Sequence, residues 1–175
     1  MTCPACGNPM TELTVSDVKV EACKGGCGGL WFPEWTLRKV DQPDQSAGEA
    51  LLHIDRNPAV AVDQNRRRNC PRDQDIVMMR HFWSVKRGVV VDECTKCEGV
   101  FLDPGELAQI RSEYGSDTER HQAAHEYYRE MFDTQLAGML REDKKKLESA
   151  RKIAHIFKFL CPSYYMPGKQ AWGAF

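Results

Sequence analysis

Seven of the eight cysteines stand in closely spaced groups, and thiols at such spacing are typical of a zinc site. In the first group, Cys3-x2-Cys6 is separated by sixteen residues from Cys23-x3-Cys27. Tetrahedral zinc is commonly held by two tight turns that each offer two thiolates. The pattern therefore predicts a zinc site made by these four cysteines, with free or disulfide-bonded thiols as the alternative.

The second group has the same form with one substitution. It consists of Cys70-x2-Asp73 followed by Cys94-x2-Cys97, so that a carboxylate stands where the first group has a thiol. Zinc accepts aspartate oxygen, although this harder ligand makes the site less soft. We expect a second zinc ion completed by Asp73. An empty site, and a fourth ligand supplied by His81 or by water, remain open as alternatives.

The two groups belong to a tandem repeat, with a first repeat from Cys3 to Val40 and a second from Cys70 to Arg111. Placing Cys97 on Cys27 aligns Gly99 with Gly29, Val100 with Leu30, Phe101 with Trp31, Leu102 with Phe32, Leu107 with Leu37 and Ile110 with Val40. An internal repeat indicates that each copy is one structural unit. Units of about 40 residues need stabilisation beyond their small core, from a disulfide, a metal ion or a partner. The cysteine spacing indicates a metal ion.

Local patterns place the ligands on turns between strands. Alternating apolar residues on either side of Ser16-Asp17 predict a hairpin between the first two cysteine pairs. A longer hairpin is expected from residues 76–83 and 88–91. After Cys97, Asp103-Pro104-Gly105-Glu106 predicts a helix start, with Asp103 as N-cap and Glu106 completing a capping box.

These motifs carry a family resemblance. Cys-Pro-x-Cys-Gly at residues 3–7 and Cys-x-Gly, an apolar run and Asp-Pro-Gly-Glu-Leu at residues 97–107 resemble the small bacterial zinc ribbons of the transcription factor IIB type. The resemblance covers both repeats. It implies two knuckles, a short sheet and a following helix, and such proteins are usually described as nucleic-acid-binding. The implied metal ligands are Cys3, Cys6, Cys23, Cys27, Cys70, Cys94 and Cys97, and Asp73 departs from the family pattern.

The predicted fold class is α+β, with two zinc ribbons followed by a long helical arm. The expected parts are ribbon 1 at residues 1–40, a linker with a short helix at 41–69, ribbon 2 at 70–113, the arm at 114–160 and an aromatic tail at 161–175. Residues 119–160 lack internal proline and carry one apolar stripe that includes Phe132, Leu136 and Leu147. This pattern predicts either one rod or two helices broken near Gly138 or residues 141–146.

Charge and composition restrict the function classes. The net charge of −1 excludes a chain that is basic throughout, but residues 56–90 hold eight basic and only three acidic residues. The candidate nucleic-acid contacts are Arg66, Arg67, Arg68, Arg72, Lys86 and Arg87. The first residues show no secretory pattern and no apolar run is long enough to span a membrane, so a cytoplasmic, zinc-containing protein is expected.

The sequence favours a non-enzymatic adaptor. No nucleophile, base and orienting group converge around either repeat, and the predicted ligands close both metal sites. The apolar stripe of the arm must be covered, and we expect a protein partner or self-association through residues 119–175. The alternative is a nucleic-acid-binding protein, related to transcription or RNA, that uses the basic region from Arg66 to Arg87.

Overall fold

The computed structural model describes residues 1–156, which fall into two compact units. Met1–Glu126 form the first unit, with a sheet and short helices, and the second unit begins at Tyr127. In its described part the second unit is helical. The predicted aromatic tail at 161–175, with Cys161, lies outside the described residues.

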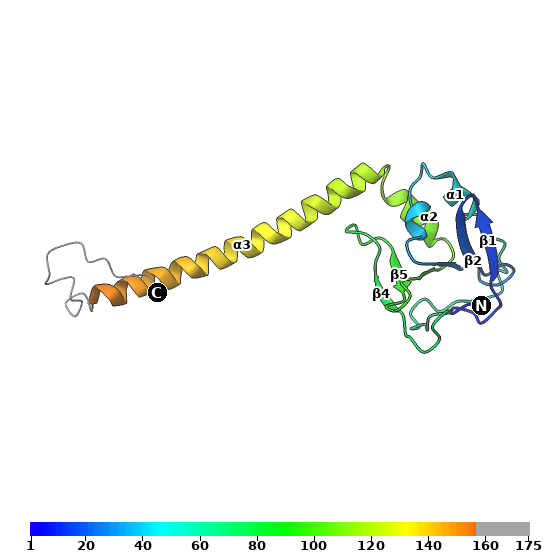
Figure 1. Ribbon diagram of the computed structural model, residues 1–175, viewed down its shortest axis with the longest axis horizontal. Helices are drawn as coiled ribbons and strands as arrows, with labels where there is room; N and C mark the ends of the chain where they lie inside the picture. The colour runs from blue at the N-terminus through cyan, green and yellow to red at the C-terminus, as the bar shows by residue number, and fades with distance from the viewer. Residues whose placement is uncertain (157–175) are drawn as a thin grey trace. The chain divides into compact units, whose positions relative to one another are not determined.

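The first unit is built on one six-stranded antiparallel sheet (Figure 1). The strand order is β1-β2-β3-β6-β5-β4, so each repeat supplies three adjacent strands and the two repeats meet between β3 and β6. The strands are β1 (Thr11–Val15), β2 (Val18–Ala22), β3 (Leu30–Phe32), β4 (Met79–Phe82), β5 (Val90–Glu93) and β6 (Val100–Leu102). Both predicted hairpins are present, as β1–β2 and β4–β5. No local sequence pattern predicts the junction between the repeats.

The junction between β3 and β6 has a local two-fold symmetry. Trp31 pairs with Phe101, its equivalent in the other repeat, while Leu30 pairs with Leu102 and Phe32 with Val100. Exchanging the two repeats therefore reproduces the same register. All six side chains are buried, because both faces of the sheet are covered at this point.

Two apolar cores lie on opposite faces of these central strands, since successive side chains of a strand point to opposite sides. Leu30 and Phe32 join one core together with Leu107 of the helix α2 (Glu106–Glu113). Trp31 and Phe101 join the other core, whose remaining buried members are Cys3, Met10, Cys23, Cys27, Cys70, Met78 and Cys94. The cysteine groups of both repeats thus belong to one shared core.

Each repeat packs its central aromatic ring onto a glycine of the other repeat. A Cβ atom added to Gly99 would lie 2.1 Å from Trp31, and one added to Gly29 would lie 2.5 Å from Phe101. Trp31 and Phe101 are both 1% exposed. The aligned glycines are therefore required because no side chain fits beneath the opposite ring. We call this pair of contacts the glycine–aromatic interlock.

Short helices follow each repeat and cover the sheet. The first repeat ends in a single 3-10 turn (Leu37–Lys39), followed in the linker by α1 (Ser46–Ala50), while the second repeat leads into α2. Arg111 of α2 is buried and donates hydrogen bonds to the backbone oxygens of Val40, Gln45 and Pro43. This one side chain fastens the linker to the second repeat.

The predicted cap of α2 is only half correct. Glu106 accepts a hydrogen bond from the Asp103 backbone N–H at 2.7 Å, as a capping box requires. The N-cap position, however, is Gly105, which adopts a positive φ of 89°. The Asp103 carboxylate is not a cap because it forms an ion pair with the buried guanidinium of Arg68.

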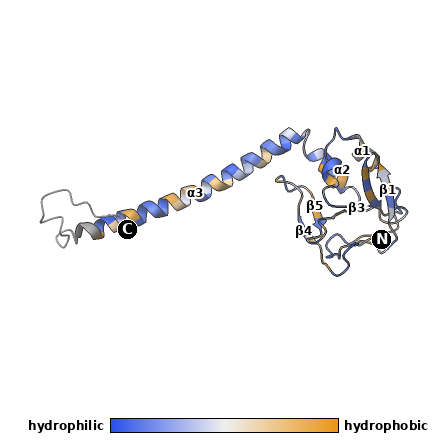
Figure 2. Cartoon of the chain, in the orientation of Figure 1, coloured by the Kyte–Doolittle hydropathy of each residue, from blue (hydrophilic) through white to orange (hydrophobic). Residues whose placement is uncertain are grey.

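The arm is one helix, α3 (Asp117–Ile156), of 40 residues. Gly138 does not interrupt it, so the alternative of two broken pieces is wrong for the described residues. The first turn is anchored within the first unit, where Arg120 pairs with the buried carboxylate of Asp41. Hydrophobic and hydrophilic residues are interspersed along the rest of the helix (Figure 2).

Replacing Gly99 with alanine tests the glycine–aromatic interlock. The added methyl group would overlap the Trp31 ring, so the Gly99→Ala variant should lose about 2 kcal/mol of unfolding free energy. Denaturant unfolding of the zinc-loaded protein, followed by tryptophan fluorescence, measures this loss. Gly138→Ala is the matched control because its new methyl group enters open space. Equal stability of the Gly99→Ala variant and the wild type would contradict the packing described here.

Candidate metal centres

Two tight turns bring the first four cysteines together. The Cys3 carbonyl accepts a hydrogen bond from Gly7, and the Cys23 carbonyl accepts one from Gly28, closing the loops that carry the ligand pairs. The Sγ atoms of Cys3 and Cys27 lie 3.5 Å apart, and those of Cys6 and Cys23 lie 3.4 Å apart. Sulfurs around tetrahedral zinc are separated by about 3.8 Å, whereas disulfide sulfurs are about 2 Å apart. These distances fit a zinc site and exclude disulfide bonds.

Burial affects the protonation of the second cysteine pair, Cys23 and Cys27. Cys3, Cys23 and Cys27 are at most 3% exposed, and burial raises the pKa of Cys23 to about 11. The neighbouring Cys3 thiol and burial also raise the pKa of Cys27, so zinc binding must displace a proton from both Cys23 and Cys27. The Gly29 N–H donates to Cys27 Sγ at 3.4 Å, which favours the thiolate form that the metal requires.

The second site brings Asp73 to the three remaining thiols. One ligand atom from each of Cys70, Asp73, Cys94 and Cys97 lies within 4.8 Å of all the others. The Cys70 sulfur accepts hydrogen bonds from the N–H groups of Arg72 and Asp73, at 3.3 and 3.1 Å. These contacts resemble the N–H to sulfur bond of the first site. The donor set fits a second zinc ion held by three thiolates and one carboxylate.

Lys96 lies beside the carboxylate ligand. Its Nζ atom is 2.6 Å from Oδ1 of Asp73, and this contact holds the pKa of Asp73 below its ordinary value. Asp73 is therefore ionised, as a zinc ligand must be, although one of its oxygens has a competing cation. The alternative fourth ligand, His81, is engaged elsewhere, with Nε2 at 2.6 Å from Oε2 of Glu93.

The predicted nucleic-acid contacts do not form one equivalent set. Arg68 is 3% exposed, pairs with Asp92 and Asp103, and lies over the ring of Phe101. Its prediction as a phosphate contact is wrong, because a guanidinium enclosed by two carboxylates holds ribbon 2 together. The sequence did not reveal this role, since the two acids lie 24 and 35 residues away.

The other basic residues are exposed, with differing contacts. Lys86 donates to the backbone oxygen of Glu113 and lies 4.1 Å from the centre of the Tyr114 ring. Arg87 lies over Phe82. The remaining exposed group, directly around the start of the second repeat, consists of Arg66, Arg67 and Arg72.

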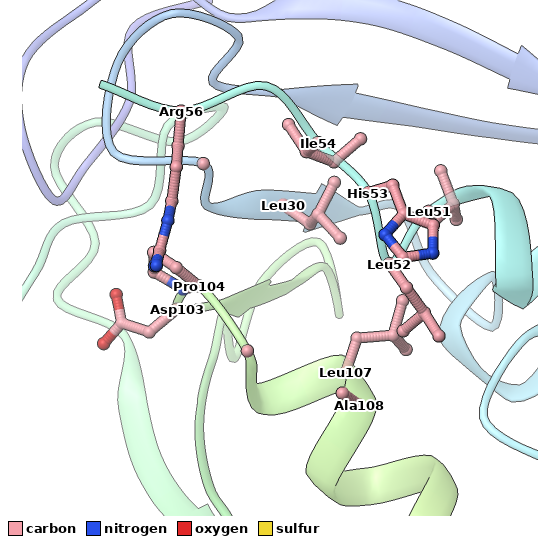
Figure 3. A pocket seen from close by; sticks show the side chains of 12 residues that line it. Leu30, Leu51, Leu52, His53, Ile54, Arg56, Asp103, Pro104, Leu107 and Ala108 are labelled. Carbon is pink, nitrogen blue, oxygen red and sulfur yellow. The ribbon is translucent and has the colours of Figure 1, made fainter. Parts of the chain in front are cut away.

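A pocket lies between the linker and the start of α2 (Figure 3). Leu30, Leu51 and Leu107 form its apolar wall, and the side chain of Arg56 points toward Asp103. None of the eight cysteine and aspartate ligands lines this pocket. It belongs to the core on the helix-covered face of the sheet, so the metal centres do not open into it.

Comparison with known proteins bears on both repeats. A sequence profile of the family described as "Transcription factor zinc-finger" matches residues 2–40 and residues 69–113. The two matched segments coincide with the two repeats. The match confirms two tandem ribbons, and the ligand geometry above agrees with one zinc ion in each. No curated protein and no solved structure matches the chain. Within residues 1–156, no helix is long and apolar enough to cross a membrane.

Metal content tests both centres. The purified protein should contain two zinc ions per chain by elemental analysis, and Asp73→Ala should contain one because the second site loses a ligand. Asp75→Ala is the matched control, since Asp75 is exposed and lies outside the ligand group. One zinc ion in the wild type would contradict the second site, and two in Asp73→Ala would show that the carboxylate is not a required ligand.

Proposed function

We propose that the protein is a zinc-stabilised, non-enzymatic adaptor that holds another polypeptide through α3. The observation that carries this proposal is the exposure of large apolar side chains in the middle of the helix. Phe132, Leu136 and Met139 are 63%, 58% and 64% exposed. Apolar surface gathered on one face of a helix is typical of helices that dock into a partner.

The ribbons support this role by their construction. Zinc held by four protein ligands leaves no coordination position for a substrate, which favours a structural rather than a catalytic metal. The β3–β6 junction and the glycine–aromatic interlock join both ribbons into one body. Arg120 and Asp41 then anchor the first turn of α3 to that body. A reducing cytoplasm, where thiols stay available to zinc, is the compartment that suits such an adaptor.

A charge placed on the apolar stripe should abolish partner binding. Leu136→Glu buries a carboxylate in the contact and should weaken binding by about a hundredfold. Co-purification of the tagged full-length chain, with the bound polypeptide quantified by mass spectrometry, measures this effect. Ala137→Glu is the control and should keep binding, because it adds the same charge one residue along the helix but off the apolar stripe. Binding that survives Leu136→Glu, or a wild-type chain that purifies as a monomer with nothing bound, would contradict the proposal.

Nucleic-acid binding is the second candidate function. It is supported by the exposed cluster of Arg66, Arg67 and Arg72 beside ribbon 2, and by the description of the matched family as a transcription factor zinc-finger. Three exposed arginines within seven residues could provide phosphate contacts without base recognition. The structure reduces the predicted set, because Arg68 is buried.

Salt dependence tests this second candidate. Affinity for a short duplex should fall steeply between about 50 and 200 mM salt. When Arg66, Arg67 and Arg72 are changed to glutamine, the slope of log K against log salt concentration should become shallower by about three. A variant with residues 144–146 changed to glutamine removes the same charge from α3 and should keep the slope. Salt-independent binding, or loss only in the α3 variant, would contradict a nucleic-acid face beside ribbon 2.

A further inference from the structure

Charge is divided unequally between the two halves of α3. Residues 117–133 contain five carboxylates and two arginines, whereas residues 141–152 contain six basic and three acidic residues. The first half is therefore net negative and the second half net positive. Such a helix is complementary to a copy of itself that runs in the opposite direction.

The exposed apolar stripe extends into both halves. At 100° per residue, Tyr128, Phe132, Leu136, Met139 and Leu147 fall on one face within an arc of about 100°. All five side chains are more than half exposed. Ala150 and Ile153 continue the same face toward the basic end. One stripe thus passes through the acidic half, the neutral middle and the basic half.

We propose that the polypeptide held by α3 is a second copy of the same chain, packed antiparallel against the stripe. This inference rests on the adaptor function and names its partner. A parallel pair would set the acidic half against the acidic half and the basic half against the basic half. The antiparallel pair instead sets the net-negative half of each copy beside the net-positive half of the other.

The stripe defines the register of this pair. When two helices run antiparallel, the numbers of two residues that lie opposite each other always add up to the same sum. With a sum of 275, the apolar stripe of one copy lies along the apolar stripe of the other. Tyr128 then lies opposite Leu147, and Leu136 lies opposite Met139. Asp143, a charged residue inside the stripe, falls opposite Phe132 at the edge of this central contact, while Arg129 and Lys146 lie on the two borders of the arc.

The same register brings opposite charges together beside the stripe. Asp133 of one copy lies near Lys144 of the other, and Glu126 lies near Arg151. Both pairs stand on one side of the apolar face and occur twice in the symmetric dimer. They specify the direction of the helices, while the apolar side chains supply the buried area.

Charge exchange in the zinc-loaded full-length chain tests the proposal. Sedimentation equilibrium should give a dimer of twice the 19.9 kDa chain mass. Asp133→Lys should raise the dimer dissociation constant about tenfold, since it places two lysines together, and Asp133→Lys combined with Lys144→Asp should restore it. Asp143→Leu should tighten the dimer, and Ala137→Lys, which lies off the stripe, is the control for added charge.

Zero-length cross-linking of mixed isotope-labelled chains locates the contact. An intermolecular cross-link between Asp133 and Lys144 is the expected product. A parallel dimer, or a double variant as weak as Asp133→Lys, would overturn the antiparallel register. A monomer at about 100 µM that captures a different protein through Leu136 would overturn self-pairing and keep the adaptor function. A monomer with no stripe-dependent partner would overturn both.

Discussion

The contact on which the first unit depends is the antiparallel pairing of β3 with β6 and the glycine–aromatic interlock around it. Gly29 and Gly99 each lie two residues after a zinc ligand, so the metal sites position the glycines that receive the opposite rings. Conversely, Trp31 and Phe101 fill the core against which the cysteines of both sites pack. Metal binding and strand pairing are therefore parts of one arrangement, and neither ribbon has a complete core of its own.

Sequence reasoning succeeded where the determinants are local. Cysteine spacing identified both ligand groups, including Asp73, and alternation identified both hairpins, because turns and short strands are encoded by adjacent residues. It missed the β3–β6 junction, because a three-residue strand carries no signal of its partner. The prediction that Arg68 contacts phosphate was wrong. A run of arginines in a sequence is expected to be exposed to solvent, and only the folded structure shows that Asp92 and Asp103 enclose this one. Asp103 could not be recognised as that partner while it also fitted a cap.

The two units use their apolar residues in opposite ways. In the first unit the largest side chains are enclosed, and even charged groups such as Asp41, Arg68 and Arg111 are buried with partners. Along α3 the large apolar side chains are exposed, and the helix is stabilised within the chain by its own hydrogen bonds and its anchored first turn. Stability is thus concentrated in the zinc-bound body, and surface available for association is concentrated in the helix.

The two-fold symmetry of the β3–β6 junction has a consequence for how such a chain can diverge. A single ribbon with the same strand would offer a self-complementary surface, as the subunits of a symmetric homodimer do. Joining two copies through residues 41–69 makes that encounter intramolecular, with an effective concentration of about millimolar that no longer depends on expression level. Once fused, the halves need not remain identical. The first copy has a cysteine, Cys6, at the position where the second copy has Asp73. A homodimer of single ribbons could not encode this difference, because both of its subunits have the same sequence.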